Sequence, residues 1–95
     1  MDESEFVEIP IDGTLDLHTF NPKDVAGLVP EYLAQCRQRG IFQVRVVHGK
    51  GTGSLKRTVI SILEKIPWVT RFQTADMDAG GWGATLVYLS EEDRP

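Results

Sequence analysis

Apolar and polar residues alternate near the start of the chain, in the segment "IDGTLDLHTF". Ile11, Leu15 and Leu17 fall on one side of this alternation, with polar or small residues between them. Because successive side chains of a strand point to opposite faces, the pattern predicts a half-buried strand that ends near His18.

A helical period follows directly. Asn21 suits the N-cap of a helix and Pro22 its first position, and an apolar stripe with three- and four-residue spacing then continues to Arg39. Gly40 is a typical stop signal after the last turn. Pro30 interrupts the stripe, and since proline inside a helix clashes with the preceding turn, we expect a kink or a restart just before it.

The second half of the chain predicts a strand, a loop, a helix and two further strands. The strand signals are "FQVRVVH", "WVTRFQTA" and "GATLVYLS", and the second helix takes its apolar stripe from Leu55 to Ile66 before Pro67. The order is therefore β-α-β-α-β-β. Strand-helix-strand crossovers are right-handed, which places both helices on one face of a mixed four-stranded sheet. We predict an α/β (α+β) two-layer sandwich.

Composition limits the class of protein but not its activity. The chain has 95 residues, 41% of them hydrophobic and 25% charged, with one cysteine and no apolar run near the ~20 residues that span a bilayer. We expect a cytoplasmic protein with no membrane partner, since its acidic N-terminus does not resemble a signal peptide. Acidic tails at 1–10 and 90–95 are expected to flank one domain at 11–89. The net charge is −4, yet residues 13–90 carry nine basic and six acidic residues, so the central part is mildly basic.

The loop "HGKGTGS" connects the second strand to the second helix. It lacks the spacing of a Walker-type loop, and Ser54 stands where the dinucleotide fingerprint needs glycine. A glycine-rich turn that leads into a helix N-terminus still offers backbone N–H groups and a favourable dipole to an anion. From these residues alone, a simple tight turn and a phosphate-binding loop both stay open, and the tight turn is the commoner case.

Three titratable residues occur where the first two strands end. Asp16 and His18 are two positions apart, so we expect them on one face of the first strand, and His48 ends the second strand. If the two strands are parallel, these residues and loop 49–53 gather at one rim, where open α/β sheets bind ligands. A structural Asp–His hydrogen bond is the alternative. A closed structural metal site is not expected, but a divalent metal recruited with substrate phosphates is compatible with this set.

Three segments together resemble one known family. "LDLH" at 15–18, "VHGKGTGSLK" at 47–56 and "GGWGATLVYL" at 80–89 resemble, in order and spacing, the small MutS-related (Smr) domain, and the likeness extends over residues 11 to 89. The resemblance implies a fold similar to the C-terminal domain of translation initiation factor three. It also implies a nucleic-acid-binding or nuclease module, of the kind found in MutS-like proteins and in proteins that cleave messenger RNA at stalled ribosomes.

The resemblance also assigns site residues. Asp16 and His18 match the family's D-x-H catalytic motif, although Thr19 and Phe20 follow the histidine where many members have Gly-Leu. The expected phosphate- or nucleic-acid-binding residues are His48, Gly49, Lys50, Gly51, Thr52, Gly53, Lys56, Arg57 and Arg71. Solvated lysines and arginines on a helix face are an equally good account of the basic residues after the loop.

The leading hypothesis is an Smr-type endonuclease that cleaves RNA, or nicks distorted or single-stranded nucleic acid, without a required cofactor. His18 would be the general acid or base, with Asp16 orienting it. RNA is favoured over DNA because its 2′-hydroxyl is a built-in nucleophile. The alternatives are a non-catalytic module that binds nucleic acid or the ribosome, and a protein-interaction domain with structural histidines.

Overall fold

The computed structural model describes residues 10–17, 20–49, 53–75 and 83–91. Their elements follow the order β1 (Thr14–Asp16), α1 (Pro22–Gln38), β2 (Gln43–Val47), α2 (Ser54–Glu64), β3 (Val69–Thr74) and β4 (Ala84–Leu89). This order confirms the β-α-β-α-β-β prediction. The connection between β3 and β4 at 76–82 lies outside the described residues, as do most of the two tails.

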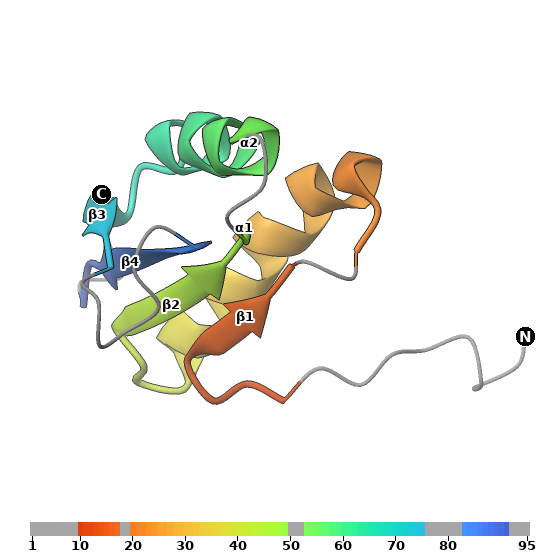
Figure 1. Cartoon of the computed structure of the whole chain (residues 1–95). Helices are drawn as coiled ribbons and strands as arrows, with labels where there is room; N and C mark the ends of the chain where they lie inside the picture. Colours follow the sequence, from red (N-terminus) through yellow and green to blue (C-terminus); the bar gives the residue numbers. More distant parts are fainter. Residues whose placement is uncertain (1–9, 18–19, 50–52, 76–82, 92–95) are drawn as a thin grey trace, which may run out of the picture.

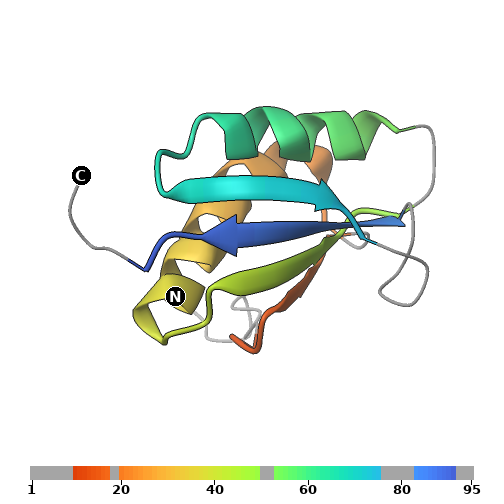
Figure 2. The ribbon, with the colours of Figure 1, turned by 90° about the vertical axis from the view of Figure 1, so that its left-hand side faces the viewer.

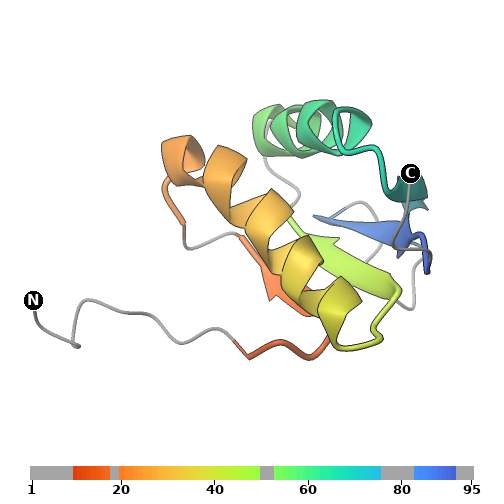
Figure 3. The same cartoon turned by 180° about the vertical axis from the view of Figure 1, so that it is seen from behind.

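The four strands form one mixed sheet in the order β1-β2-β4-β3. β1 pairs with β2 in parallel, whereas β4 pairs antiparallel with both β2 and β3. The β1-α1-β2 crossover places α1 behind β1 and β2 in Figure 1, and in front of them when the molecule is seen from behind in Figure 3. α2 runs along β3 and packs against α1, as Figure 2 shows. The two-layer sandwich of the prediction is confirmed.

The two faces of the sheet differ in burial. Val44 and Val46 of β2 and Val87 of β4 are fully buried under the helices, and the register pairs Val44 with Val87. Gln43 and Arg45 alternate with the two β2 valines and lie on the opposite face, more exposed. Strand alternation therefore divides the sheet into a core face and a helix-free face, and each polar strand residue belongs to one of them.

Helix α1 begins and ends as its sequence predicts. The Asn21 side chain accepts a hydrogen bond from the backbone N–H of Lys23 at 3.2 Å. At the other end Gly40 has φ +79°, and its N–H donates to Arg37 O while the N–H of Ile41 donates to Cys36 O. These two bonds form a Schellman motif, which needs a residue that accepts positive φ.

Pro30 lies inside α1, and the helix runs unbroken from Pro22 to Gln38. The expected restart at this proline is therefore wrong. Val25 and Val29 before it and Leu33 after it are fully buried in the same core. Packing of one continuous apolar stripe keeps both halves of the helix in the same core, although Pro30 cannot donate a backbone hydrogen bond.

Tyr32 ties α1 to the start of β1. Its hydroxyl donates to the carbonyl oxygen of Thr14 at 3.0 Å and accepts from the N–H of Gly13 at 3.2 Å. Burial raises the pKa of the Tyr32 phenol, so the hydroxyl stays protonated and keeps its donor. This contact fixes the position of the strand that carries Asp16.

No helix among the described residues has the length and apolar character needed to cross a membrane.

Candidate functional site

The candidate site lies at the edge of the sheet where β1 and β2 end together. Asp16, the last residue of β1, is in register with Val47, the last residue of β2. The next N–H, that of Leu17, donates to Val47 O at 2.7 Å. The glycine loop begins one residue after this point, so the end of β1 lies directly beside the start of the loop.

Asp16 is presented on the helix-free face. Leu15 and Leu17, its two neighbours, are buried in the core at 1% and 0% exposure, and Asp16 between them is exposed. Alternation along the strand therefore directs the carboxylate away from the helices. His18 lies outside the described residues, so the predicted pairing of Asp16 with His18 remains a prediction.

His48 has a different position from Asp16. It is 4% exposed, and its Nε2 atom lies 2.8 Å from the Thr85 hydroxyl, on the core face of β4. Its Nδ1 atom lies 3.1 Å from Gly49 O. A carbonyl oxygen only accepts, so Nδ1 carries the proton, and Nε2 of the neutral ring accepts the proton of the Thr85 hydroxyl.

This environment keeps His48 neutral. Burial lowers the pKa of the His48 ring, the hydrogen bond to Gly49 opposes that shift, and the charge of Lys56 adds to it. Both ring nitrogens are occupied by protein partners. The arrangement suits a histidine that shapes the loop better than one that exchanges protons with a substrate.

The backbone around His48 is also fixed. The N–H groups of His48 and Gly49 both donate to the carbonyl oxygen of Gly83, at 2.8 and 2.9 Å. The start of the glycine loop is thus bound to the residue before β4. Gly49 has φ +84°, a conformation that side chains with a Cβ rarely adopt.

The expected gathering of site residues at one rim is only partly present. Asp16 and His48 do lie at the same edge, because β1 and β2 are parallel and end in register. Their side chains, however, project from opposite faces of the sheet: Asp16 from the helix-free face and His48 from the core face. A direct Asp16–His48 pair is therefore excluded in this structure.

The glycine loop ends at the N-terminus of α2. Gly53 is the N-cap, with φ +90°; it provides no side-chain cap, and the first turn of α2 holds no acidic residue. The expected binding residues Lys50, Gly51 and Thr52 lie outside the described residues. A cavity of about 210 Å³ adjoins the described ends of the loop, and it is lined by Pro22, His48, Gly49, Gly53, Ser54, Leu55, Lys56 and Thr58. Helix N-termini with this character favour anions.

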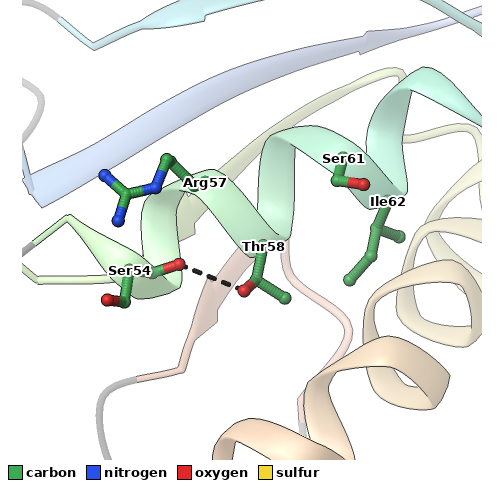
Figure 4. Close-up of a pocket in the computed structure, with 5 residues that line it drawn as sticks. All are labelled: Ser54, Arg57, Thr58, Ser61 and Ile62. Carbon is green, nitrogen blue, oxygen red and sulfur yellow. Dashed lines mark hydrogen bonds between the residues drawn. The ribbon is translucent and has the colours of Figure 1, made fainter.

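Two basic residues of α2 flank this cavity in different ways. The Lys56 ammonium donates to the Thr74 hydroxyl of β3 at 3.2 Å, so its side chain extends toward the sheet. Arg57 lies on the outer side of the helix, where Figure 4 shows it in a second, shallower pocket with Ser54 and Thr58. A Cβ built at Gly53 would lie 3.6 Å from Nη1 of Arg57, so this guanidinium is next to the end of the loop.

Arg71 lies far from the loop. It belongs to β3, pairs with Tyr88, and its guanidinium stacks over the Tyr88 ring at 4.3 Å from the centroid. Tyr88 is four residues along β4 from Ala84, which pairs with Val47 at the site edge. Three strand spacings and four residues along the strand separate Arg71 from Asp16 by roughly 20 Å. Arg71 therefore shares the helix-free face with Asp16 but not the site itself.

Comparison with known proteins identifies the family. A family model described as the Smr domain matches residues 15–90, most of the chain. The chain belongs to the Smr domain family. Over 75 positions it is 40% identical to a protein called endonuclease MutS2 from Carboxydothermus hydrogenoformans, and the aligned region covers 79% of this chain and 10% of that relative. A second endonuclease MutS2, from Clostridium botulinum, is 32% identical over 79 residues. This chain thus spans about a tenth of the length of these relatives.

Solved structures give the same relationship for this Smr domain. The Smr domain of Thermus thermophilus MutS2 matches with a TM-score of 0.77 at 31% identity, over 88% of this chain and all of that one. YdaL, a stand-alone small MutS-related protein from Escherichia coli, matches with a TM-score of 0.75 at 25% identity, over 85% of this chain and 66% of that one. The likeness predicted from the three sequence motifs is confirmed.

Two residues of the Smr domain that contact the predicted site residues were not predicted from the sequence. Thr85 is hydrogen-bonded to His48. The sequence signal that could have placed Thr85 on the buried face is its spacing, because it lies two and four positions before the buried residues Val87 and Leu89 on β4. Tyr88 stacks with Arg71 and, like Leu86, lies on the helix-free face of β4. Within the described parts of the chain, no three His, Cys, Asp or Glu residues lie close enough together to hold a metal ion.

Proposed function

We propose that this Smr domain binds nucleic acid and cleaves it as an endonuclease, with RNA as the favoured substrate. One observation carries the proposal: Asp16, exposed at the end of β1, is in register with the residue that precedes the loop "HGKGTGS". A carboxylate and an anion-binding loop thus occupy one edge of the sheet. The name "endonuclease" of the MutS2 relatives supports the same class of activity.

The roles follow from the chemistry of the residues. His18, two positions after Asp16 in the sequence, acts as general base and then general acid, and Asp16 orients it and stabilises its charged form. The backbone N–H groups at the N-terminus of α2, from Gly53 onward, hold the phosphate, and the dipole of α2 stabilises its developing negative charge. Arg57, beside Gly53, adds positive charge to the same place.

The favoured reaction uses the RNA's own hydroxyl. His18 takes the proton of a 2′-hydroxyl, and the 2′-oxygen attacks the adjacent phosphorus. The bond from phosphorus to the 5′-oxygen breaks, and the leaving oxygen receives a proton from the protonated base. The products are a 2′,3′-cyclic phosphate and a 5′-hydroxyl, and no water or other co-reactant is consumed in this step.

The test is cleavage of single-stranded RNA by the purified protein with a chelator present. We expect fragments with cyclic-phosphate ends, and no cleavage of an RNA whose nucleotide at the cut carries a 2′-deoxy sugar. His18→Ala should remove cleavage and keep binding, while His48→Gln, which alters the histidine on the other face, should retain the cyclic-phosphate chemistry. Cleavage of the 2′-deoxy strand at an equal rate would overturn the proposed mechanism.

Binding and cleavage must be followed separately, because the second candidate function is a binding module. Its specific support is the Arg71–Tyr88 stack, a surface feature about 20 Å from the proposed site that needs no chemistry to contact nucleic acid. A wild-type protein that binds RNA and cuts neither RNA nor DNA, with or without added divalent metal, is a binding module. An identical cleavage rate in His18→Ala would overturn the role proposed for His18.

A further inference from the structure

The helix-free face of the sheet presents an ordered array of side chains outside the proposed site. Beyond the row Asp16–Val47–Ala84 at the site edge, in which Ala84 is fully buried, the register defines two further rows across it. One row runs Thr14, Arg45, Leu86 and Gln73, and the other runs Gln43, Tyr88 and Arg71. All side chains of these two further rows are partly or fully exposed. Figure 1 views β1 and β2 from this side, with α1 behind them.

Charge and shape on this face suit a nucleic acid. Among its described strand residues two are basic, Arg45 and Arg71, and one is acidic, Asp16 at the far edge. Its larger apolar side chains, Val47, Leu86 and Tyr88, are each only partly exposed, and Arg45 pairs with Leu86 two positions before Val47. Three partly exposed apolar side chains flanked by arginines are few for the apolar centre of a stable protein interface. A polyanion needs basic and π-rich contacts, and this face provides both.

Tyr88 provides the π surface. It lies on β4, an inner strand of the sheet, between Gln43 of β2 and Arg71 of β3. The Arg71 guanidinium already stacks on its ring at 4.3 Å, so the two planar groups form one preformed platform. Aromatic rings and guanidinium planes on an open sheet bind unpaired bases by stacking, which tolerates any base because every base has a π face.

We propose that the helix-free face is a single-stranded RNA track, on which the Arg71–Tyr88 platform stacks a base several nucleotides away from the scissile phosphate. The inference rests on the proposed function, which places the scissile phosphate at the site edge. It adds Tyr88 as a substrate-binding residue and makes the unpaired state of the RNA a requirement for tight binding. Because Asp16 lies on the same face, a strand leaving the site edge continues onto the platform without crossing the sheet.

The geometry also predicts a length requirement. Arg71 and Asp16 are roughly 20 Å apart, so a short oligonucleotide can occupy the site edge or the platform but cannot join them. A longer strand reaches both and gains the affinity of both contacts. Loss of the platform should therefore weaken binding of a long strand and leave a short strand at the site edge nearly unaffected.

The experiment measures binding by fluorescence anisotropy in the His18→Ala background, so that the RNA stays intact. Tyr88→Leu keeps an apolar side chain on β4 and removes the ring, whereas Tyr88→Phe keeps the ring. We expect Tyr88→Leu to weaken binding of a strand of about 16 nucleotides by roughly 5- to 100-fold, and Tyr88→Phe to retain it. A strand of about 2 nucleotides, which is too short to reach from the site edge to the platform, should bind both variants alike at the site edge. Thermal melting of each variant reports whether the fold is intact.

Different outcomes separate this proposal from the proposed function. Ring-dependent binding by a protein whose parent form cuts no RNA supports the platform and overturns the nuclease. Cleavage by the wild type, together with equal affinity of Tyr88→Leu and Tyr88→Phe for the long strand, overturns the platform alone. If Tyr88→Leu changes only self-association in sedimentation velocity and not RNA binding, the face is a contact between copies of this chain, which also overturns it. Duplex RNA binding as tight as single-stranded RNA counts against it as well.

Discussion

The Nε2 atom of His48 lies 2.8 Å from the Thr85 hydroxyl, and this buried contact joins the end of β2 to the core face of β4. The same histidine uses Nδ1 to hold Gly49 O. One side chain thus connects the sheet to the first residue of the glycine loop. Among the described residues no buried side-chain nitrogen or oxygen lacks a hydrogen-bond partner, so loss of either contact leaves a polar atom unsatisfied.

Thr85→Val tests this connection, because valine has nearly the shape of threonine and no hydroxyl. It leaves Nε2 of His48 buried without a donor, so we expect a loss of about 1–3 kcal/mol in the free energy of unfolding, measured by urea denaturation. Thr70→Val is the matched control, since the Thr70 hydroxyl donates to Tyr88 O at an exposed position. It should cost less than about 0.5 kcal/mol. Equal losses in the two variants would show that the buried contact contributes nothing special.

The free energy of unfolding should depend on pH because His48 is buried in its neutral form. Burial places the pKa of His48 in the folded protein below its ordinary value of 6.5. Between these two values the unfolded chain binds more protons than the folded chain, so the free energy of unfolding falls as the pH drops below about 6.5. Above 6.5 this contribution is fully present.

His48→Gln should flatten that dependence, because glutamine does not titrate. The measurement is the difference in urea midpoint between a pH above 6.5 and one well below it, compared with the wild type. The assignment to His48 fails if His48→Gln shows the same acid loss as the wild type.

Gly49→Ala should separate stability from binding. Gly49 has φ +84°, and a residue with a Cβ pays roughly 1–2 kcal/mol to adopt this conformation. Gly40, with φ +79° at the end of α1, is a matched site remote from the loop. Apart from the chain neighbours, no atom of the described residues lies within 4 Å of a Cβ added at either glycine. Both alanine variants should lose similar stability by thermal melting. Only Gly49→Ala should lose RNA affinity; a similar loss in Gly40→Ala would reduce the effect to general destabilisation.

The salt dependence of RNA binding should identify the arginine that faces the phosphate. Removing one phosphate contact lowers the slope of log affinity against log salt by about 0.7 for a single strand. We expect this change for Arg57→Ala, whose guanidinium lies beside Gly53. Arg39→Ala removes the same charge at the far end of α1, where Arg39 is bonded to Gln35, and should leave the slope unchanged. Equal slopes for both variants would mean that Arg57 contributes only to the general field.

Periodicity predicted much of this fold because each element buries one apolar row. The 3.6-residue stripe of α1 and the strand alternation of β1 appear in the structure nearly as expected, and the parallel pairing of β1 with β2 follows from the helix between them. The relative faces of Asp16 and His48 were harder to predict. Val47 is apolar like Val46 and obscures the end of the β2 pattern, although the alternation of Gln43 and Arg45 with the valines favours Val46, and hence His48, on the core face.

Long-range partners were beyond sequence reasoning for a different reason. The His48–Thr85 and Arg71–Tyr88 contacts depend on the registers of β4 with β2 and β3, which are set by packing across the whole sheet. No local pattern encodes such a register. The same limit applies to Arg71, whose sequence position suggested the phosphate site and whose strand places it roughly 20 Å away.

Pro30 gives a prediction about stability alone. Alanine at this position would restore a backbone donor to α1, and proline in a helix interior is about 3 kcal/mol less favourable than alanine. Proline also restricts the unfolded chain, which offsets about 0.4–1 kcal/mol of that difference. We therefore expect Pro30→Ala to raise the free energy of unfolding by about 2–2.6 kcal/mol, measured by urea denaturation. Pro22→Ala, at the first position of the helix where proline fits, should give no gain. A less stable Pro30→Ala protein would mean that contacts of the proline ring outweigh the missing hydrogen bond.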